Sequence, residues 1–527
     1  MGIYLNPSNV GFKQILAADI YVDKTMMISE LNKFIDKCNQ YICVSRPRRF
    51  GKTFATNMLC AYYSKGCDSR ELFQNLKISK ADNYEKYLNK LNFIAIDVAS
   101  EYQNAKDKDN MLNKLSDFVV SEFKTQFPSV DLSSAETIAD CMLRVYAAKG
   151  ETFVIILDEY DSLVRMNVSP KLFADYLEFL NGLFKSNTLK PAISLAYITG
   201  ILPVVRDKVQ SKLNNFDEYT IIDAKELSEY VGFTDEEVAI LCDKYQINHT
   251  ECKNWYQGYS QNGFDIYNPE SVIKSIKNRR FEGHWSKTSS YQVIIDRLNA
   301  NFKGMKDDVI KMVSGENVKV NVSRYMNTMT DFNNKDDAFT YLTHLGYLAY
   351  DYNTQTCRIP NKEVRLEWFN ALEDDKTYKV TDQIIKASEE LLQQTLQLNG
   401  NEVAKALNRS HIHVASHRNY DNEQALASAV YLAFIDALNY YTVFKETSAG
   451  NGIADLIYTP LHADSKYPPM IIELKSNKTP GRAIAQIKSK EYFHAFDHYN
   501  GKILFIGINY DEKKKHQCEI EEFTNLD

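Results

Sequence analysis

Two groups of polar residues in this sequence have the types and spacing that phosphate chemistry needs. The first is the stretch RPRRFGKT, which ends as a phosphate-binding loop does, in Gly51, Lys52 and Thr53. In such a loop, backbone N–H groups face the phosphates, the lysine reaches the outer phosphates and the threonine hydroxyl binds Mg²⁺. Arg46 stands where the regular pattern has its first glycine, so these residues alone leave a chance match open.

An acidic motif about a hundred residues later supports a nucleotide site. The apolar run FVIIL ends in Asp158 and Glu159. Two carboxylates that close a buried strand are costly without a cation, so we expect Asp158 to bind Mg²⁺ and Glu159 to polarise the attacking water. Thr199 ends another apolar run, ITG, and is placed like a sensor residue near the γ-phosphate. The alternative, that the strand ending in Asp158 and Glu159 merely reaches the surface at these residues, stays open.

The second group lies near the C-terminus, in IADLIY and IIELKS. Alternate residues of a strand share a face, so Glu473 and Lys475 point the same way, and a hairpin brings Asp455 beside Glu473. Two carboxylates at one place repel unless a divalent ion such as Mg²⁺ bridges them. That ion would polarise a phosphodiester and activate water, and Lys475 would orient the water or stabilise the developing charge.

The apolar pattern predicts the elements that must position these residues. Four short runs are apolar on both faces, which predicts a parallel sheet covered by helices on each side. These runs are residues 41–45, 93–98, 153–158 and 194–200. The pattern turns helical beyond residue 232, where Thr234 and Glu237 form a capping box. A helix near residue 340 and a hairpin around DYNTQT predict either a winged-helix-like unit or a packing subdomain.

Length and composition limit the class of protein. A chain of 527 residues with 44% hydrophobic and 25% charged residues is expected to fold into about three domains. We expect a nucleotide-binding domain at 1–285, a helical, winged-helix-like connecting region at 286–375 and an α/β nuclease-like domain at 376–527. The net charge of −7 is mild and gives no global field for a polyanion, so any nucleic-acid contact would come from local basic patches. The nine cysteines form no CxxC pair. No apolar run approaches a membrane span, so a cytoplasmic protein is expected.

Several motifs together resemble the bacterial AAA-ATPase-like family over about residues 5–285. They are YVDKT (21–25), RPRRFGKT (46–53), LDEYD (157–161), ITG (198–200), SKLNNF (211–216), GFTDEEV (232–238), WYQGY (255–259) and YNPESV (267–272). In that family a loop beginning Arg-Pro-Arg-Arg-Phe-Gly-Lys replaces the regular one. The resemblance therefore implies ATP and Mg²⁺ as cofactors, and it does not by itself imply hydrolysis.

The resemblance also implies which loop residues meet the nucleotide. They are Arg46, Pro47, Arg48, Arg49, Phe50, Gly51, Lys52 and Thr53. Arg48 and Arg49 would touch phosphate or project to a neighbouring subunit of a homo-oligomer. Arg165 and Arg206 are further candidates for γ-phosphate charge, and a surface or salt-bridge role is the alternative for each.

The C-terminal pattern resembles the PD-(D/E)XK nuclease superfamily, in which an Asp strand precedes Glu-x-Lys. The resemblance implies metal ligation by Asp455, Glu473, Glu423 and Glu446 and catalysis by Lys475 and Gln486. The two resemblances together predict a nucleotide-regulated, Mg²⁺-dependent nuclease acting on nucleic acid, with DNA favoured. Two alternatives stay open: a nucleotide-sensing protein that binds nucleic acid or a partner without cutting, and an ATPase that remodels a protein partner.

Overall fold

The structure is a computed structural model of the 527-residue chain. It describes residues 2–166, 168–204, 213–285, 292–300, 302–313, 315–325, 332–374, 379–414, 423–460, 466–497, 499–511, 513 and 515–525. The chain divides into two units: Met1–Ser290, Ala300–Asp308 and Asn317–Glu367 form the first, and Tyr291–Asn299, Val309–Glu316 and Trp368–Asp527 form the second. Within the described ranges, no helix combines the length and apolarity needed to cross a membrane.

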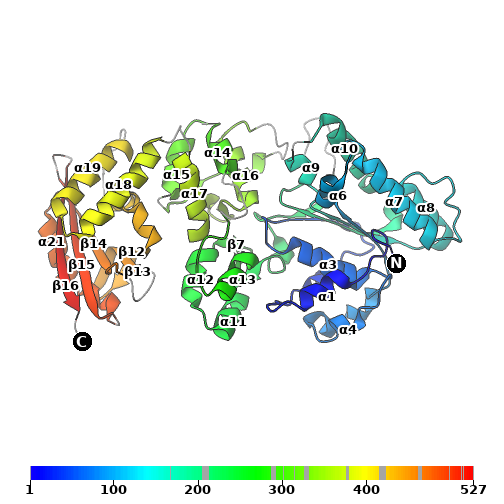
Figure 1. The fold of residues 1–527 in the computed structure, drawn as a ribbon, viewed down its shortest axis with the longest axis horizontal. Helices are drawn as coiled ribbons and strands as arrows, with labels where there is room; N and C mark the ends of the chain where they lie inside the picture. The colour runs from blue at the N-terminus through cyan, green and yellow to red at the C-terminus, as the bar shows by residue number, and fades with distance from the viewer. Residues whose placement is uncertain are drawn as a thin grey trace. The chain divides into compact units, whose positions relative to one another are not determined.

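The first unit is built on a five-stranded parallel sheet (Figure 1). In spatial order its strands are β2 (Asn92–Asp97), β3 (Phe153–Asp158), β4 (Ile193–Gly200), β1 (Tyr41–Ser45) and β5 (Asp217–Tyr219). Each neighbouring pair runs parallel. The α/β class predicted from the four apolar runs is confirmed, because those runs are β1 to β4.

Helices cover both faces of this sheet, which explains why the strands are apolar on both sides. Ile42 and Val44 of β1 pack on one face, whereas Tyr41 and Cys43 pack on the other. The first face holds α1 (Val10–Leu16), α2 (Met26–Leu31), α3 (Lys52–Tyr63), α4 (Arg70–Phe73) and α5 (Tyr84–Tyr87). The opposite face holds α6 (Val98–Asn104), α7 (Met111–Gln126), α8 (Ile138–Lys149), α9 (Ser162–Arg165) and α10 (Pro170–Phe184).

A helical region follows β5, as predicted. Its elements are β6 (Phe233–Thr234), α11 (Asp235–Tyr245), α12 (His249–Tyr256), β7 (Tyr259–Gln261), β8 (Phe264–Tyr267) and α13 (Pro269–Asn278). The capping box of Thr234 and Glu237 is present at the start of α11. This part has its own apolar core, to which Val238, Trp255 and Val272 contribute.

The predicted hairpin is also present. After α14 (Gln292–Leu298) and α15 (Met305–Val313), the strands β9 (Val318–Lys319), β10 (Ala349–Asp351) and β11 (Thr356–Arg358) form a small antiparallel sheet, with α16 (Lys335–Leu345) before β10 and α17 (Lys362–Asp374) after β11. Most of α16 is buried, including Phe339, Leu342 and His344. A buried helix cannot enter a DNA groove, so this arrangement favours the packing subdomain over a DNA-reading winged helix.

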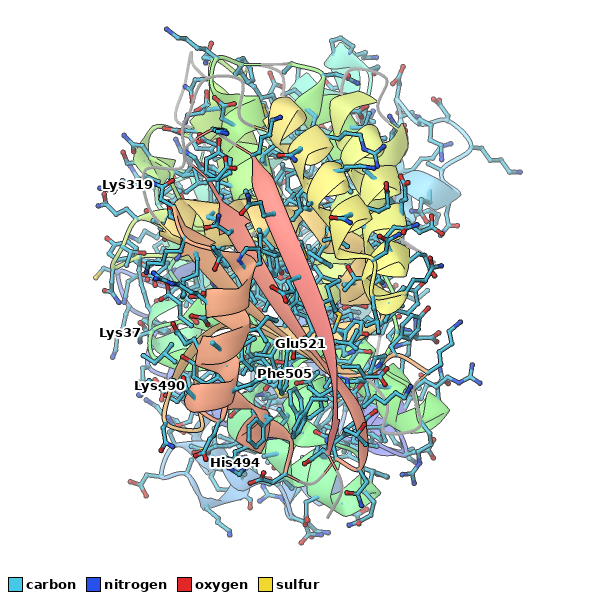
Figure 2. All side chains as sticks on the ribbon, turned by 90° about the vertical axis from the view of Figure 1, so that its left-hand side faces the viewer. Lys37, Lys319, Lys490, His494, Phe505 and Glu521 are labelled. Atoms are coloured by element: carbon cyan, nitrogen blue, oxygen red, sulfur yellow. The ribbon has the colours of Figure 1, made fainter. Side chains whose placement is uncertain are left out.

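The second unit carries a five-stranded mixed sheet in sequence order. Its strands are β12 (Tyr441–Ala449), β13 (Gly452–Pro460), β14 (Met470–Ser476), β15 (Gly501–Tyr510) and β16 (His516–Asn525). Only β14 and β15 are parallel, because α21 (Pro480–Ser489) crosses between them. The helices α18 (Lys379–Leu396), α19 (Gly400–Val414) and α20 (Glu423–Ala433) precede the sheet. Figure 2 looks onto this unit, with Lys490 at the end of α21 and Glu521 on β16 labelled.

Two candidate sites for phosphate chemistry

The loop between β1 and α3 has the strand-loop-helix context that phosphate binding needs. Its backbone is left-handed at Arg49, with φ 70°, and at Gly51, with φ 90°. Left-handed residues in such a loop turn successive N–H groups toward one concavity, which suits an anion. Lys52 is the first residue of α3, so the positive end of that helix stands behind the loop.

Arg46 points into the protein. Its side chain is fully buried, and Nη1 donates to the carbonyl oxygens of Ser45 and Tyr219 at 2.9 and 2.8 Å. Burial lowers the pKa of the guanidinium to about 10. The arginine that replaces the first glycine therefore ties the end of β1 to β5, and any contact from it to a nucleotide would come from its backbone.

The other loop residues differ in exposure. Pro47 and Phe50 are buried, whereas Arg48 is exposed. Arg49 is held by the protein: its Nη1 donates to the carbonyl oxygen of His284 at 3.1 Å, and its Nε lies 3.3 Å from Glu270 Oε2. Arg48 is therefore the loop arginine best placed to meet a ligand or a neighbouring subunit.

Lys52 lies at the centre of its own loop. Its Nζ donates to the carbonyl oxygens of Arg46 and Pro47, each at 3.2 Å, and lies 3.6 Å from Glu159 Oε1. Burial lowers the pKa of Lys52, and the surrounding carboxylates oppose that shift. Phosphate oxygens bind an ammonium group more strongly than carbonyl oxygens do, so an entering phosphate can take over this cation.

Asp158 ends β3 close to the start of α3. Its carboxylate accepts the Glu159 N–H at 2.9 Å and the Thr56 hydroxyl at 3.3 Å. Burial raises the pKa of Asp158 to about 6, and a hydrogen bond from Thr53 opposes the rise. The structure thus brings together Thr53 and Asp158, the two residues from which a Mg²⁺ site was expected.

Thr199 lies on β4, between β1 and β3. It is fully buried, and its hydroxyl donates to the carbonyl oxygen of Val44 at 2.8 Å. The residue is on the strand expected of a sensor, but its hydroxyl is used within the sheet. A contact to a γ-phosphate would require this hydrogen bond to break.

Glu159 lies between two cations. One oxygen faces Lys52, and the other pairs with Arg165 Nη2. Arg165 also binds Asp161 through Nε at 2.9 Å, and Asp161 accepts backbone N–H groups just after β4. Arg165 is therefore a salt-bridge residue here. No role for Asp161 was expected from the sequence, although its spacing of four residues from Arg165 was an available signal.

The C-terminal site forms where the ladder between β13 and β14 opens. Leu456 pairs with Ile472, but the ladder does not continue to Asp455 and Glu473. Instead, Asp455 Oδ2 accepts the N–H of Leu474 at 2.7 Å. Because this side chain replaces a backbone acceptor, the hydrogen bond holds the Asp455 carboxylate in the gap beside Glu473.

Glu473 and Lys475 share one face of β14, as the alternation of a strand predicts. Lys475 Nζ donates to Glu473 Oε1 at 2.7 Å and to the Leu474 carbonyl oxygen at 2.9 Å. Gln486 Nε2, on α21, also donates to Glu473 Oε1. The structure therefore gathers Asp455, Glu473, Lys475 and Gln486 into one cluster, and their catalytic roles stay predictions.

Glu473 keeps one oxygen for a further partner. The residue is 2% exposed, and Oε2 is buried with no hydrogen-bond partner among the described residues. Burial, with a smaller effect of Asp455, raises the pKa of Glu473 to about 7. A buried carboxylate oxygen without a donor is costly, and a divalent cation is the partner that suits two adjacent carboxylates. Asp455 and Glu473 therefore fit a metal ion.

A metal ion held by Asp455 and Glu473 would need further ligands in addition to these two side chains. In the described part of the chain, no group of three or more His, Cys, Asp or Glu residues is placed to hold an ion. Mg²⁺ is often bound by one or two carboxylates together with water and substrate oxygens, so two carboxylates are sufficient for that ion.

Glu446 and Glu423 are less closely tied to this cluster, and Arg206 was expected at the nucleotide site. Glu446 stands opposite Asp455 at an interruption of the β12–β13 ladder, with φ 44° and an exposed side chain. A left-handed residue other than glycine is strained, and such strain is common at functional sites. Glu423 begins α20, but its side chain lies outside the described residues, and Arg206 lies outside them entirely.

Tyr492 belongs to the C-terminal cluster and was not indicated by the sequence. Its hydroxyl donates to the carbonyl oxygen of Ile453 at 2.7 Å and accepts from Gln486 Nε2 at 3.1 Å. The strand that carries Asp455 is thus bonded to the helix that carries Gln486. Tyr492 and Ile453 are 39 residues apart, so no local pattern could have found this contact.

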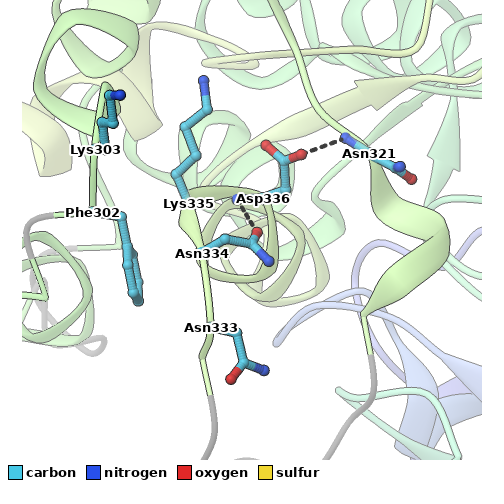
Figure 3. A pocket seen from close by; sticks show the side chains of 7 residues that line it. All are labelled: Phe302, Lys303, Asn321, Asn333, Asn334, Lys335 and Asp336. Atoms are coloured by element: carbon cyan, nitrogen blue, oxygen red, sulfur yellow. Dashed lines mark hydrogen bonds between the residues drawn. The ribbon is translucent and has the colours of Figure 1, made fainter.

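A cavity of about 390 Å³ in the first unit lies apart from these residues (Figure 3). Its lining consists of Phe302, Lys303, Asn321, Asn333, Asn334, Lys335 and Asp336. The polar groups are used locally: Asn334 Oδ1 accepts the Asp336 N–H at 2.8 Å, and Lys335 pairs with Asp308. The cavity therefore shows no constellation of catalytic residues.

Comparisons with known proteins separate the same two regions. Residues 10–210 match a family described as Predicted AAA-ATPase, and residues 421–520 match the PD-(D/E)XK nuclease superfamily. A protein of Azotobacter chroococcum mcd 1, described as "Uncharacterized protein in vnfD 5'region", is 23% identical over 283 residues. That alignment covers 53% of this chain and 52% of the relative, so the chain spans about half of the relative's length.

Solved structures were also matched. One of them is the Aeropyrum Pernix ORC2 protein in its ADPNP-ADP complexes, with 10% identity, a TM-score of 0.25, and coverage of 66% of this chain and 92% of that one. A TM-score this low does not establish a shared fold.

Proposed function

We propose that this chain, which carries a predicted AAA-ATPase domain and a PD-(D/E)XK nuclease superfamily domain, is a nucleotide-regulated, Mg²⁺-dependent nuclease. Its reaction is hydrolysis of a phosphodiester bond of nucleic acid, with DNA as the favoured substrate. One observation carries the proposal: Glu473 Oε2 is buried beside Asp455 with no hydrogen-bond partner in the described part of the chain, while Lys475 and Gln486 donate to the other oxygen.

Each residue of the C-terminal cluster has a part in this reaction. Asp455 and Glu473 would hold the metal ion, which supplies Lewis-acid activation of the phosphodiester. Lys475, fixed by its bonds to Glu473 and to the Leu474 carbonyl, places positive charge where negative charge develops. Gln486 fixes the Glu473 carboxylate by its hydrogen bond from α21.

The N-terminal unit would bind ATP. Lys52 would reach the outer phosphates, Thr53 and Asp158 would hold Mg²⁺, and Glu159 would polarise water. Arg48, which is exposed, would meet phosphate or the nucleotide of a neighbouring subunit if the chain forms a homo-oligomer. A cytoplasmic location stays a prediction.

Exposed cations before, in and after α21, the helix that carries Gln486, support a nucleic-acid substrate. Lys478, Arg482 and Lys490 are exposed in and after the segment that leads from β14 into α21. Lysine and arginine contacts to phosphates supply most of the non-specific affinity for nucleic acid, and such binding weakens as salt increases.

The experiment that tests the proposal is incubation of the purified chain with plasmid DNA, single-stranded DNA and RNA. Each substrate is tested with Mg²⁺ or EDTA, and with or without ATP. The expected result is metal-dependent cleavage that Asp455→Asn and Glu473→Gln abolish. Glu521→Gln is the matched control, because Glu521 lies on β16 and pairs only with Lys488 among the ion pairs of the described residues.

Two outcomes would contradict the proposal. Cleavage that persists in both carboxylate variants would remove the metal site from the mechanism. If labelled DNA is bound but none of these conditions yields cleavage products, the alternative is favoured: a nucleotide-sensing protein that binds nucleic acid without cutting it.

A further inference from the structure

Apart from the exposed Arg48, the residues that distinguish the loop of this chain from a regular glycine-rich loop pack against the protein. Phe50 packs edge-to-face on Tyr259 of β7, with ring centroids 5.3 Å apart. Pro47 lies so close to Gly346 that a Cβ on the glycine would approach Pro47 Cβ to 2.8 Å. Tyr259 in turn donates to the Gly346 carbonyl oxygen at 2.7 Å. The loop is therefore one side of a packed contact within the first unit.

Arg49 adds a polar connection to this contact. Its Nε lies 3.3 Å from Glu270 Oε2 on α13, and its Nη1 donates to the His284 carbonyl oxygen at 3.1 Å. The Arg49 side chain is 13% exposed. Glu270 uses its other oxygen for Lys274, at 2.5 Å, so each oxygen has its own cation.

The backbone of Arg49 is strained in the conformation that the loop needs. Its φ of 70° is left-handed, a conformation that is strained for a non-glycine residue and persists only where the surroundings hold it. A left-handed residue at this place turns neighbouring N–H groups into the concavity of the loop. The two bonds at the end of the Arg49 side chain are the contacts that can hold it there.

The connection continues from His284 to α17. The His284 N–H donates to Glu363 Oε1 at 2.7 Å, and the Ser271 hydroxyl donates to Glu363 Oε2 at 2.8 Å. Glu363 is 1% exposed and lies in the first turn of α17. A change at Arg49 can therefore reach α17 through a chain of direct contacts.

We propose that Arg49 is a positioning residue, whose bonds to Glu270 and the His284 carbonyl hold the loop in its phosphate-binding shape and tie occupancy of the loop to α17. This inference rests on the proposed nucleotide function of the loop. It assigns regulation of that site to the contact among Arg49, Glu270 and His284, and it assigns no phosphate contact to the Arg49 side chain.

The test measures binding of Mg²⁺·ADP by calorimetry in the full chain and four variants. Arg49→Met should weaken binding about tenfold, because the left-handed backbone loses its support. Arg49→Gly should bind more tightly than Arg49→Met, because glycine adopts positive φ without a steric cost. Glu270→Gln should weaken binding about threefold to tenfold, because it removes one of the two supports. Lys274→Gln, which touches the same carboxylate but not the loop, should bind as the wild type does.

Hydrogen exchange provides a second readout. In the wild type, Mg²⁺·ADP should slow exchange at the His284 N–H and in the first turn of α17, and Glu270→Gln should lose that response. A thermal melt of each variant checks that the chain is folded.

The outcomes separate this inference from the function on which it rests. Wild-type protein that binds no nucleotide overturns the nucleotide site itself, and with it this proposal. If the wild type binds but Arg49→Gly is no better than Arg49→Met, the positioning role is overturned. Tighter binding by Glu270→Gln would also overturn it, because an Arg49 released from the contact would then be a phosphate ligand.

Discussion

The two candidate sites differ in whether the charged group expected to meet the ligand already has partners. In the N-terminal site, Lys52 is bonded to carbonyl oxygens of its loop and faces Glu159, whose other oxygen pairs with Arg165. In the C-terminal site, Glu473 Oε2 is buried with no hydrogen-bond partner among the described residues. A ligand at the first site must exchange existing contacts, whereas a cation at the second supplies a missing one.

This difference has an energetic consequence. Replacing protein contacts by ligand contacts changes the free energy only by the difference between the two sets of contacts, because the contacts that are lost offset those that are gained. Relieving a buried oxygen that lacks a partner recovers its desolvation penalty. We therefore expect substitutions at the C-terminal site to have larger effects on ligand affinity than substitutions of Glu159, which pairs with Lys52 at the N-terminal site.

The largest effect is expected for Glu473→Gln. It removes one of two carboxylates and the oxygen that lacks a partner, so affinity for Mn²⁺ or Mg²⁺, measured by calorimetry, should fall about 100-fold or more. Glu521→Gln should leave it unchanged. Equal metal affinities in the wild type and the Glu473 variant would contradict the expectation that a cation binds at Glu473.

Lys475→Met should separate metal binding from cleavage. The ammonium lies 2.7 Å from Glu473 Oε1, so its loss should not weaken metal affinity, because one competing cation is removed. Cleavage of DNA should fall about 100-fold or more, because positive charge beside the phosphate is lost. Parallel losses in calorimetry and in the cleavage assay would mean that Lys475 supports the metal site itself.

Glu159→Gln sharpens the contrast from the N-terminal side. Glu159 competes with phosphate for Lys52, so its neutralisation should leave ATP affinity unchanged or make it up to about tenfold tighter, while any ATP turnover is lost. The matched variant Lys52→Met should weaken ATP binding. If the Glu159 variant binds ATP more weakly than the wild type, Glu159 does not compete with phosphate for Lys52.

A smaller effect is expected from the tyrosines behind the C-terminal cluster. Tyr492→Phe removes two hydrogen bonds and should lower the free energy of local opening of β13 by about 1 kcal/mol. Tyr458→Phe is the matched control, because the Tyr458 hydroxyl is buried without a hydrogen-bond partner among the described residues, and it should be neutral. Amide exchange of β13 in EDTA measures both. Equal shifts in the two variants would contradict the expected difference.

An effect that depends on pH is expected for Glu363, a buried carboxylate whose oxygens both accept hydrogen bonds. Burial raises its pKa from 4.5 to about 8, so the folded state binds this proton more tightly than the unfolded state does. Its contribution to stability is therefore complete below pH 4.5 and is lost as the pH rises toward 8. Glu363→Gln should flatten the fall in melting temperature between about pH 6 and pH 8. An unchanged slope would mean that Glu363 titrates normally.

Much of the fold was predictable because burial on both faces leaves a direct signal in the sequence. The runs that became β1 to β4 are apolar on both faces, and the capping box at Thr234 and Glu237 marks the start of α11. The cluster at Glu473 could be predicted for a similar reason, because strand alternation sets which residues share a face. Contacts over long separations, such as that of Tyr492 with Ile453, leave no such signal.

The sequence by itself determined the residue types and the order of the strands along the chain. It showed a lysine after a buried strand, two carboxylates at the end of another, and Glu-x-Lys on one face of a third. Those facts follow from local periodicity. Only the tertiary structure decided what each polar atom touches. It turned Arg46 inward onto carbonyl oxygens and gave Glu159 two cations, and among the residues that the structure describes it left Glu473 Oε2 without a hydrogen-bond partner. The physical reason is that electrostatic interactions and desolvation act over a few ångströms in space, whatever the distance along the chain.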